Sequence, residues 1–253
     1  MSPDLEQALA ARLLALADDE LILAHRNSEW TGHAPILEED IAFTNIALDE
    51  MGHARIWYEQ LEALQGADPD SLIFFRPAAE FSNVRMVELP PGDWAFSMLR
   101  QYLFDSYELV RATQTLESRY RPMAEAAAKI RPEELYHHRH TALWVRRLGL
   151  GTEESNGRMQ QALDSLWPAV FQLFAPLPGE EQLVAAGYVP APAQLQAAWE
   201  REARPFLEDA GLRLPPDPQA PATVAPRSEH TEHLEPLVAD LQEVARLERE
   251  AEW

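Results

Sequence analysis

Cysteine is absent from the 253 residues of the chain. Its absence excludes disulfide bonds, iron–sulfur clusters held by thiolates, and catalysis by a thiol. Long apolar runs are missing too, since no stretch approaches the roughly 20 residues that a membrane-spanning helix needs. The first 14 residues also lack the basic start and apolar run of a signal peptide. We therefore expect a cytoplasmic protein with no membrane partner.

Basic residues are scarce. The chain has 21 lysines and arginines against 42 aspartates and glutamates, which gives a formal net charge of −21. A field of this sign repels phosphate backbones, so the sequence predicts no nucleic-acid partner. The densest basic group, Arg139, Arg146 and Arg147, is interpreted as one solvated helical face.

Apolar residues recur at spacings of three and four, without sustained alternation, which predicts an all-α protein. Two long helices come first, then a connection rich in proline, then two more long helices. Two antiparallel pairs joined by one long crossover are typical of the ferritin-like four-helix bundle. The expected helices cover about 4–29, 38–64, 93–120 and, starting at Pro122 or Pro132, up to 149.

Additional helices are expected after the bundle. They cover about 152–174, with Thr152 as N-cap, then 191–209 and 231–250. Five prolines between residues 214 and 226 predict an extended linker, because proline cannot continue a helix. We divide the chain into a bundle over 1–176 and a C-terminal helical extension over 177–253.

Two copies of one motif could carry chemistry. Glu50 and His53 form Glu-x-x-His on the second helix, and Glu134 and His137 repeat it on the fourth. Residues three apart lie on one face of a helix. In ferritin-like di-metal proteins two helices supply this motif and the other two supply one carboxylate each. One copy alone is a weak signal, but two copies at matching places are much stronger.

The other two carboxylates are assigned to the first and third helices. Glu20 is the candidate on the first helix, where it has apolar neighbours. On the third helix Glu108 is preferred because glutamate is the usual residue there, and Asp105 is the alternative. Six such groups would suit two iron or manganese ions. The competing interpretation is that the carboxylates lie at the surface and the histidines are ordinary core residues.

Several short motifs follow one another in a fixed order from about residue 10 to the C-terminus. They lie at 28–30, 32–35, 37–42, 100–105, 147–149, 151–155, 166–168 and 230–234. In order and spacing these motifs resemble the C subunits of bacterial phenylacetyl-CoA epoxidases, the multicomponent enzymes of aerobic phenylacetate catabolism.

The resemblance implies a ferritin-like fold and a partnership with a homologous A subunit that carries the catalytic di-iron centre. It further implies electrons from a reduced nicotinamide cofactor, through other components, and dioxygen as the source of the epoxide oxygen. C subunits look like structural partners that have largely lost the metal ligands. This chain departs from that pattern, because Glu20, Glu50, His53, Glu108, Glu134 and His137 appear as a full set.

Three hypotheses follow. The first is a subunit of the 1,2-epoxidase that supports the catalytic subunit, with a homodimer of this chain as the alternative assembly. The second is a di-metal oxygenase or oxidase centre held by this chain itself. The third, metal storage, is disfavoured because a simple storage bundle needs neither the proline-rich linker nor the terminal helix. We also expect residues 230–253 to dock as a helix, and the surface to carry surplus aromatic residues for a partner.

Overall fold

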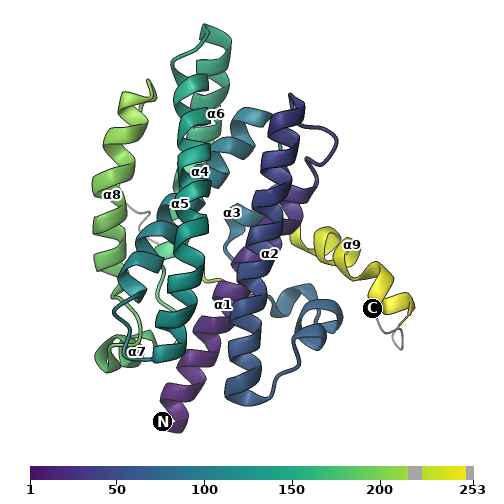
Figure 1. The fold of residues 1–253 in the computed structure, drawn as a ribbon, viewed down its shortest axis with the longest axis vertical. Coiled ribbons are helices and arrows are strands. Elements are labelled where there is room, and N and C mark those ends of the chain that lie inside the picture. The colour runs from purple at the N-terminus through teal and green to yellow at the C-terminus, as the bar shows by residue number, and fades with distance from the viewer. Residues whose placement is uncertain (216–223, 249–253) are drawn as a thin grey trace. The chain divides into compact units, whose positions relative to one another are not determined.

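The computed structural model describes residues 1–215 and 224–248, and every regular element in this part of the chain is a helix (Figure 1). The all-α prediction is confirmed. Residues 216–223 of the predicted linker and the last residues of the predicted terminal helix lie outside the described residues. The chain forms two compact units, residues 1–90 with the described part of 226–253, and residues 91–225. The boundary at residue 176 stays a prediction.

The first unit is built on the hairpin of α1 (Pro3–Ser28) and α2 (Leu37–Gln65), which pack side by side (Figure 1). Both helices begin and end within two residues of the predicted positions. The Ser2 hydroxyl caps α1 by accepting from the Leu5 amide, and Gly66 ends α2 in the left-handed conformation, with φ of 71°. Leu13 of α1 and Phe43 of α2 are among the fully buried side chains of this unit.

The connection after α2 contains short elements that apolar periodicity does not reveal. These are a π-helical turn η1 (Ser71–Phe75), a 3-10 turn η2 (Ala78–Glu80) and α3 (Arg85–Glu88). Two aspartates of α1 hold the segment in place. Asp18 accepts a 2.7 Å hydrogen bond from the Ser82 amide, and Asp19 accepts one of 2.7 Å from the Val84 amide.

The end of the chain completes this unit. Arg227 donates to Asp19 at 2.7 Å, and His230 contacts the buried Glu88 carboxylate at 2.7 Å. Helix α9 (Leu234–Leu247) then packs on η1 and η2. The predicted terminal helix is therefore present and docked.

The second unit is built on α4 (Trp94–Thr115) and α5 (Arg121–Gly149). Asp93 caps α4 as predicted, accepting from the Phe96 amide at 2.9 Å. The helix ends at Thr115, five residues before the expected Tyr120. Beyond this end, the Ser118 hydroxyl donates a 2.7 Å hydrogen bond to the Tyr188 carbonyl. Pro122 lies in the first turn of α5 and Pro132 lies inside it, so the earlier of the two predicted starts is correct.

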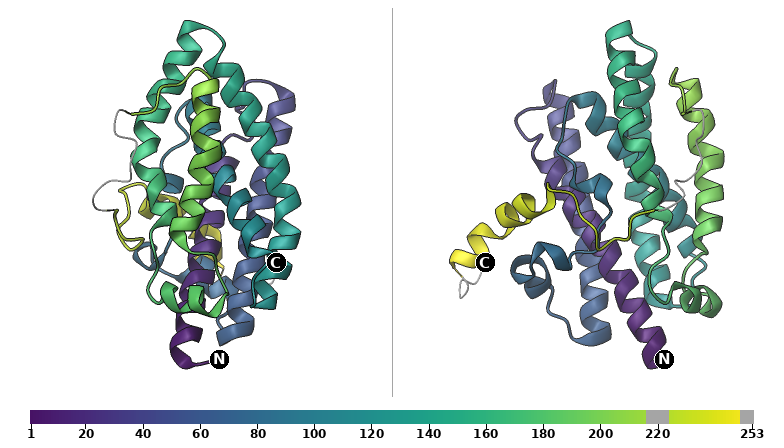
Figure 2. Two further views of the ribbon diagram at one scale, coloured as in Figure 1. Left: turned by 90° about the vertical axis from the view of Figure 1, so that its left-hand side faces the viewer. Right: turned by 180° about the vertical axis from the view of Figure 1, so that it is seen from behind.

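Helices α6 (Glu153–Val170) and α8 (Pro192–Asp209) pack on this pair, and Figure 2 shows α8 alongside it. The turn η3 (Phe171–Phe174) and the unpredicted α7 (Glu180–Ala186) connect them. Each unit is thus built on one antiparallel helix pair. In the sequence a long crossover joins the two pairs, and further helices follow the second pair. This order confirms the ferritin-like class. No helix among the described residues combines the length and apolarity that crossing a membrane requires.

Candidate metal centre

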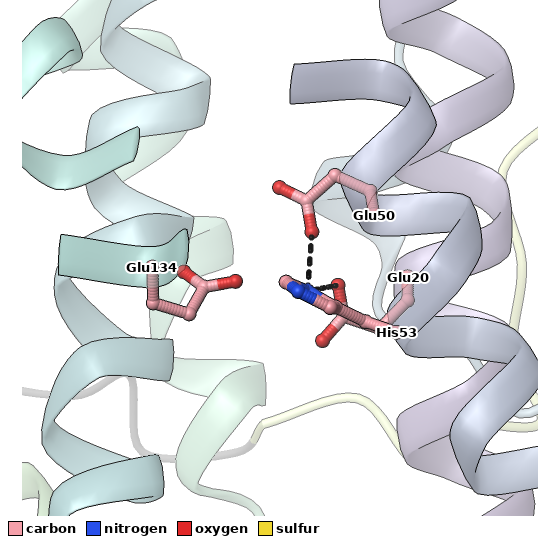
Figure 3. A group of neighbouring side chains, drawn as sticks. All are labelled: Glu20, Glu50, His53 and Glu134. Atoms are coloured by element: carbon pink, nitrogen blue, oxygen red, sulfur yellow. Dashed lines mark ion pairs between the residues drawn. The ribbon is translucent and has the colours of Figure 1, made fainter. Parts of the chain in front are cut away.

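Three of the predicted ligands lie together in the first unit. His53 Nδ1 is 3.5 Å from a Glu50 carboxylate oxygen and 3.9 Å from one of Glu20, as the dashed lines in Figure 3 show. The three residues offer ligand atoms within 4.8 Å of one another, and each side chain is at most 1% exposed. We call Glu20, Glu50 and His53 the first half-site.

The helix geometry explains this grouping. Glu50 and His53 share the face of α2 that also carries the fully buried Ile46 and Trp57, so both polar side chains point away from solvent. Glu20 occupies the corresponding apolar part of α1, between buried leucines and alanines. The sequence pattern of a polar pair between apolar neighbours therefore does indicate an interior position.

The second unit gathers the other predicted ligands around α5. Glu134 and His137 are both fully buried, and a Glu134 oxygen lies 3.7 Å from His137 Nδ1. Asp105 of α4 is also fully buried and offers a ligand atom within 4.8 Å of one on His137. Asp105, Glu134 and His137 form the second half-site.

Glu108 is placed differently from Asp105. Both oxygens of its buried carboxylate contact the Arg111 guanidinium, with a 2.7 Å hydrogen bond from Nε. Asp105 instead accepts from neutral donors, Gln101 at 2.6 Å and Thr141 at 2.8 Å. A carboxylate already paired with an arginine is a poor candidate for a metal ligand.

The neighbouring histidines have other surroundings. His138 is half-buried, and burial lowers its pKa, which the nearby Glu202 and Glu134 carboxylates partly offset. Its ring lies 5.5 Å from that of Tyr102, and the half-buried His140 stacks on Tyr136 at 6.2 Å. Both rings are therefore partly covered.

The donor set fits a hard or borderline divalent ion. Carboxylate oxygens together with imidazole nitrogens are the ligands that iron and manganese accept, and each half-site contains both kinds. The hydrogen bonds to Asp105 from Gln101 and Thr141 are of the type that orients a metal-ligating carboxylate. The residues present are therefore chemically suited to hold such ions.

Known proteins resemble this chain along its whole length. The family model described as "Phenylacetic acid catabolic protein" matches residues 1–253. The C subunit of the 1,2-phenylacetyl-CoA epoxidase of Escherichia coli K12 is 39% identical over 246 residues, covering 97% of this chain and 99% of that protein. The A subunit of the same enzyme is 25% identical over 161 residues, covering 63% of this chain and 52% of that relative.

Proposed function

The chain belongs to the phenylacetic acid catabolic protein family, and from that membership we propose that it is the C-type subunit of a phenylacetyl-CoA 1,2-epoxidase. In this role it binds and supports a homologous A-type subunit, which carries the catalytic di-iron centre. The complex would epoxidise the aromatic ring of phenylacetyl-CoA in the cytoplasm, in aerobic phenylacetate catabolism.

The observation that carries this proposal is the end-to-end match to the C-type relative. That alignment covers 99% of the relative, whereas the alignment to the A-type relative covers about half of it. A chain of the A type would be expected to match the A-type relative along its length. The weaker match to that protein supports a pairing of two homologous helical subunits.

The proposal is tested by co-expressing this chain with the A-type subunit from the same source. Obligate subunit interfaces bury large areas, so one gel-filtration peak at the summed mass is expected at micromolar concentration. The matched control is each subunit expressed alone. Epoxidation of phenylacetyl-CoA, with the reductase component added, should need both chains. Two peaks at the separate masses would contradict the proposal.

A second function is favoured by the two half-sites, and we propose it beside the first. Glu20, Glu50 and His53 would hold one side of a di-metal centre, and Asp105, Glu134 and His137 the other. When bound, two iron or manganese ions supply the chemistry that activates dioxygen. The chain's own part is to hold and orient the ligands and to exclude water. That the two half-sites share ions is a prediction from the sequence pattern.

Charge supplies the physical argument. Removing an ion from water costs several kcal/mol even after the protein relaxes. Glu20, Glu50, Asp105 and Glu134 are all at most 1% exposed, so four buried carboxylates need neutralisation. Two divalent cations would offset four negative charges and leave the imidazoles neutral. In the absence of metal, protons on the carboxyls or on the histidines, or other buried cations of the chain, would have to do the same.

The test is metal content after anaerobic incubation with ferrous iron and removal of the excess. We expect about two ions per chain, the number that this ligand pattern holds in ferritin-like proteins. Changing Glu50→Ala together with Glu134→Ala should abolish binding, and Asp105→Asn should weaken it. Glu108→Gln is the matched control, because its carboxylate is already paired with Arg111, and it should retain the metal. A wild-type chain that stays metal-free would refute this second function and leave the first intact.

A further inference from the structure

Helix α2 exposes an apolar face on the side opposite its buried residues. Leu37, Ile41, Leu48 and Met51 are 70%, 55%, 61% and 43% exposed. Their spacings of four, seven and three residues place them on one face of a helix. Ile46, Glu50, His53 and Trp57, all buried, lie about half a turn away. Single exposed leucines are ordinary in proteins, but four large apolar side chains in one row indicate a contact surface.

Gly52 lies beside this row, in the interior of α2, and is exposed. A glycine inside a helix is destabilising relative to alanine. Its backbone is helical, and among the described residues nothing lies within 4 Å of the place where a Cβ would stand. Packing within the chain therefore does not require glycine here. A second backbone that approaches α2 closely would require it.

The row leads into a hollow of about 790 Å³ beside α2. Its apolar lining includes Leu48 and Met51 of α2, Ile73 and Phe74 of η1, and Leu241 of α9. Its charged lining has four acidic residues, Glu59, Glu62, Asp68 and Asp70, and one basic residue, Arg55, which pairs with Glu59 at 2.7 Å. The hollow is therefore lined partly by apolar side chains and partly by mainly acidic ones.

We propose that this α2 face, defined as Leu37, Ile41, Leu48, Met51 and Gly52, is where the A-type subunit docks, through a helix with an apolar face and basic flanks. The inference rests on the proposed function within an epoxidase complex. Packed helices approach to 8–10 Å depending on the side chains at the contact, and a glycine at the crossing allows the closest approach.

Charge decides between the two candidate occupants. A second copy of this chain would bring the same acidic rim and another net charge of −21 to the contact. Like charges placed opposite one another in an interface cost several kcal/mol, whereas a basic rim is attracted. A homologous but differently charged subunit is the partner that fits.

The experiment uses two changes at the face and two matched controls. Gly52→Trp fills the open space on α2, and Leu48→Gln removes an exposed apolar contact. Gly157→Trp in α6 is the first control, because Gly157 is also an exposed helical glycine with nothing of the described chain within 4 Å. Leu143→Gln in α5 is the second, because Leu143 is 67% exposed, close to the value for Leu48. Circular dichroism and thermal melting verify that each variant folds.

Each variant is then titrated with the purified A-type subunit, and the dissociation constants are compared. At a hot spot, loss of the contact weakens binding by about 30-fold or more, which we expect for Gly52→Trp. Leu48→Gln should weaken it by about tenfold, and both controls should stay within about threefold of wild type.

Each other outcome has a defined meaning. If folded face variants bind like wild type, or if the controls weaken binding equally, the α2 face is not the docking site, although the proposed function stands. If wild type shows no binding to the A-type subunit, the proposed function itself fails. If the face variants abolish only self-association of this chain, the occupant is a second copy and the proposal is overturned.

Discussion

At the scale of single residues, the first unit contains a buried ionic cluster apart from the half-sites. The Tyr58 hydroxyl donates to Asp18 at 2.6 Å, and the Arg76 guanidinium donates to the same oxygen. Burial raises the pKa of Tyr58 well above its ordinary value, and the Asp18 charge raises it further. Removing Asp18 would leave the Arg76 cation buried without this carboxylate, a loss typically of about 3–5 kcal/mol. The cluster fastens the crossover segment to the helix hairpin.

The raised pKa of Tyr58 predicts a loss of stability in alkali. The unfolded chain releases this proton near pH 10, while the folded chain retains it, so above about pH 10 the unfolded state binds fewer protons. Stability is then fully present below about pH 10 and falls by about 1.4 kcal/mol per pH unit above it. Urea unfolding of Tyr58→Phe at about pH 9, 10 and 11 should show a shallower decline. Tyr136→Phe, an exposed site, is the control, and an unchanged slope in Tyr58→Phe would contradict the assignment.

Gly52 predicts a conflict between stability and assembly. Because a Cβ at this position meets nothing of the described chain within 4 Å, Gly52→Ala should stabilise the isolated protein by about 0.5–1 kcal/mol. The same methyl group should weaken the complex with the A-type subunit. Thermal melting of the free chain and titration of the complex measure the two effects separately. A variant that stabilises both states equally would show that no backbone approaches α2 here.

The sequence predicted the burial of the candidate ligands better than the choice among them. Glu50 and His53 lie at helical spacing, Glu20 lies on the preceding helix, and all three are buried as their apolar neighbours indicate. Glu108 was preferred over Asp105 because of its residue type alone. The signal that could have separated them is Arg111, three residues after Glu108 and thus on the same face of α4. The partners of Asp105 include Thr141 on another helix, which no single-helix pattern reveals.

At the scale of elements, α9 is attached by polar side chains, among them Gln242, as well as by its apolar face. The Gln242 amide donates 2.8 Å hydrogen bonds to the carbonyls of Ile73 and Arg76, at the end of the π-helical turn η1. Leu234, Leu237 and Val238 on the same helix are buried. Gln242 thus satisfies backbone groups that an irregular turn leaves open.

We expect Gln242→Ala to loosen α9 without unfolding the hairpin. The buried Arg76 carbonyl and the partly buried Ile73 carbonyl would lose their donor, and loss at a buried carbonyl costs about 1–3 kcal/mol. Hydrogen exchange of the α9 amides should accelerate by about tenfold or more, while exchange in α1 stays unchanged. Glu243→Ala, at the exposed neighbouring position, should alter neither helix. Acceleration spread evenly over the first unit would instead indicate global destabilisation.

The long helices were predictable because each repeats its apolar residues over several turns, and α1, α4 and α6 also begin at a side-chain N-cap. Thr152 illustrates this, since its hydroxyl accepts from the Ser155 amide at 3.2 Å in a reciprocal capping box. Helix α7 was missed because its seven residues are too few for a period, although Gly179 and Gly187 bound it in left-handed conformations.

The expected surplus of aromatic residues on the surface was wrong. Among the described residues, the exposed large apolar side chains are aliphatic except for Tyr136.

At the scale of the whole molecule, net charge should control the rate of assembly. With a formal charge of −21, the chain attracts a basic partner surface over distances that dissolved salt shortens. We expect the association rate with the A-type subunit to fall by about tenfold between roughly 20 and 300 mM salt, with a smaller change in dissociation. Stopped-flow fluorescence of the tryptophans would measure both rates. A salt-independent association rate would show that charge does not steer the encounter.

The discontinuous first unit imposes an order on biosynthesis. Its first 90 residues leave the ribosome long before Arg227 and His230, which contact the buried Asp19 and Glu88. During the synthesis of all 135 residues of the second unit, from 91 to 225, those two carboxylates lack these partners. The nascent hairpin must therefore remain open or hydrated at this place, and a chain stopped near residue 225 would be a substrate for chaperones and proteases rather than a smaller working protein.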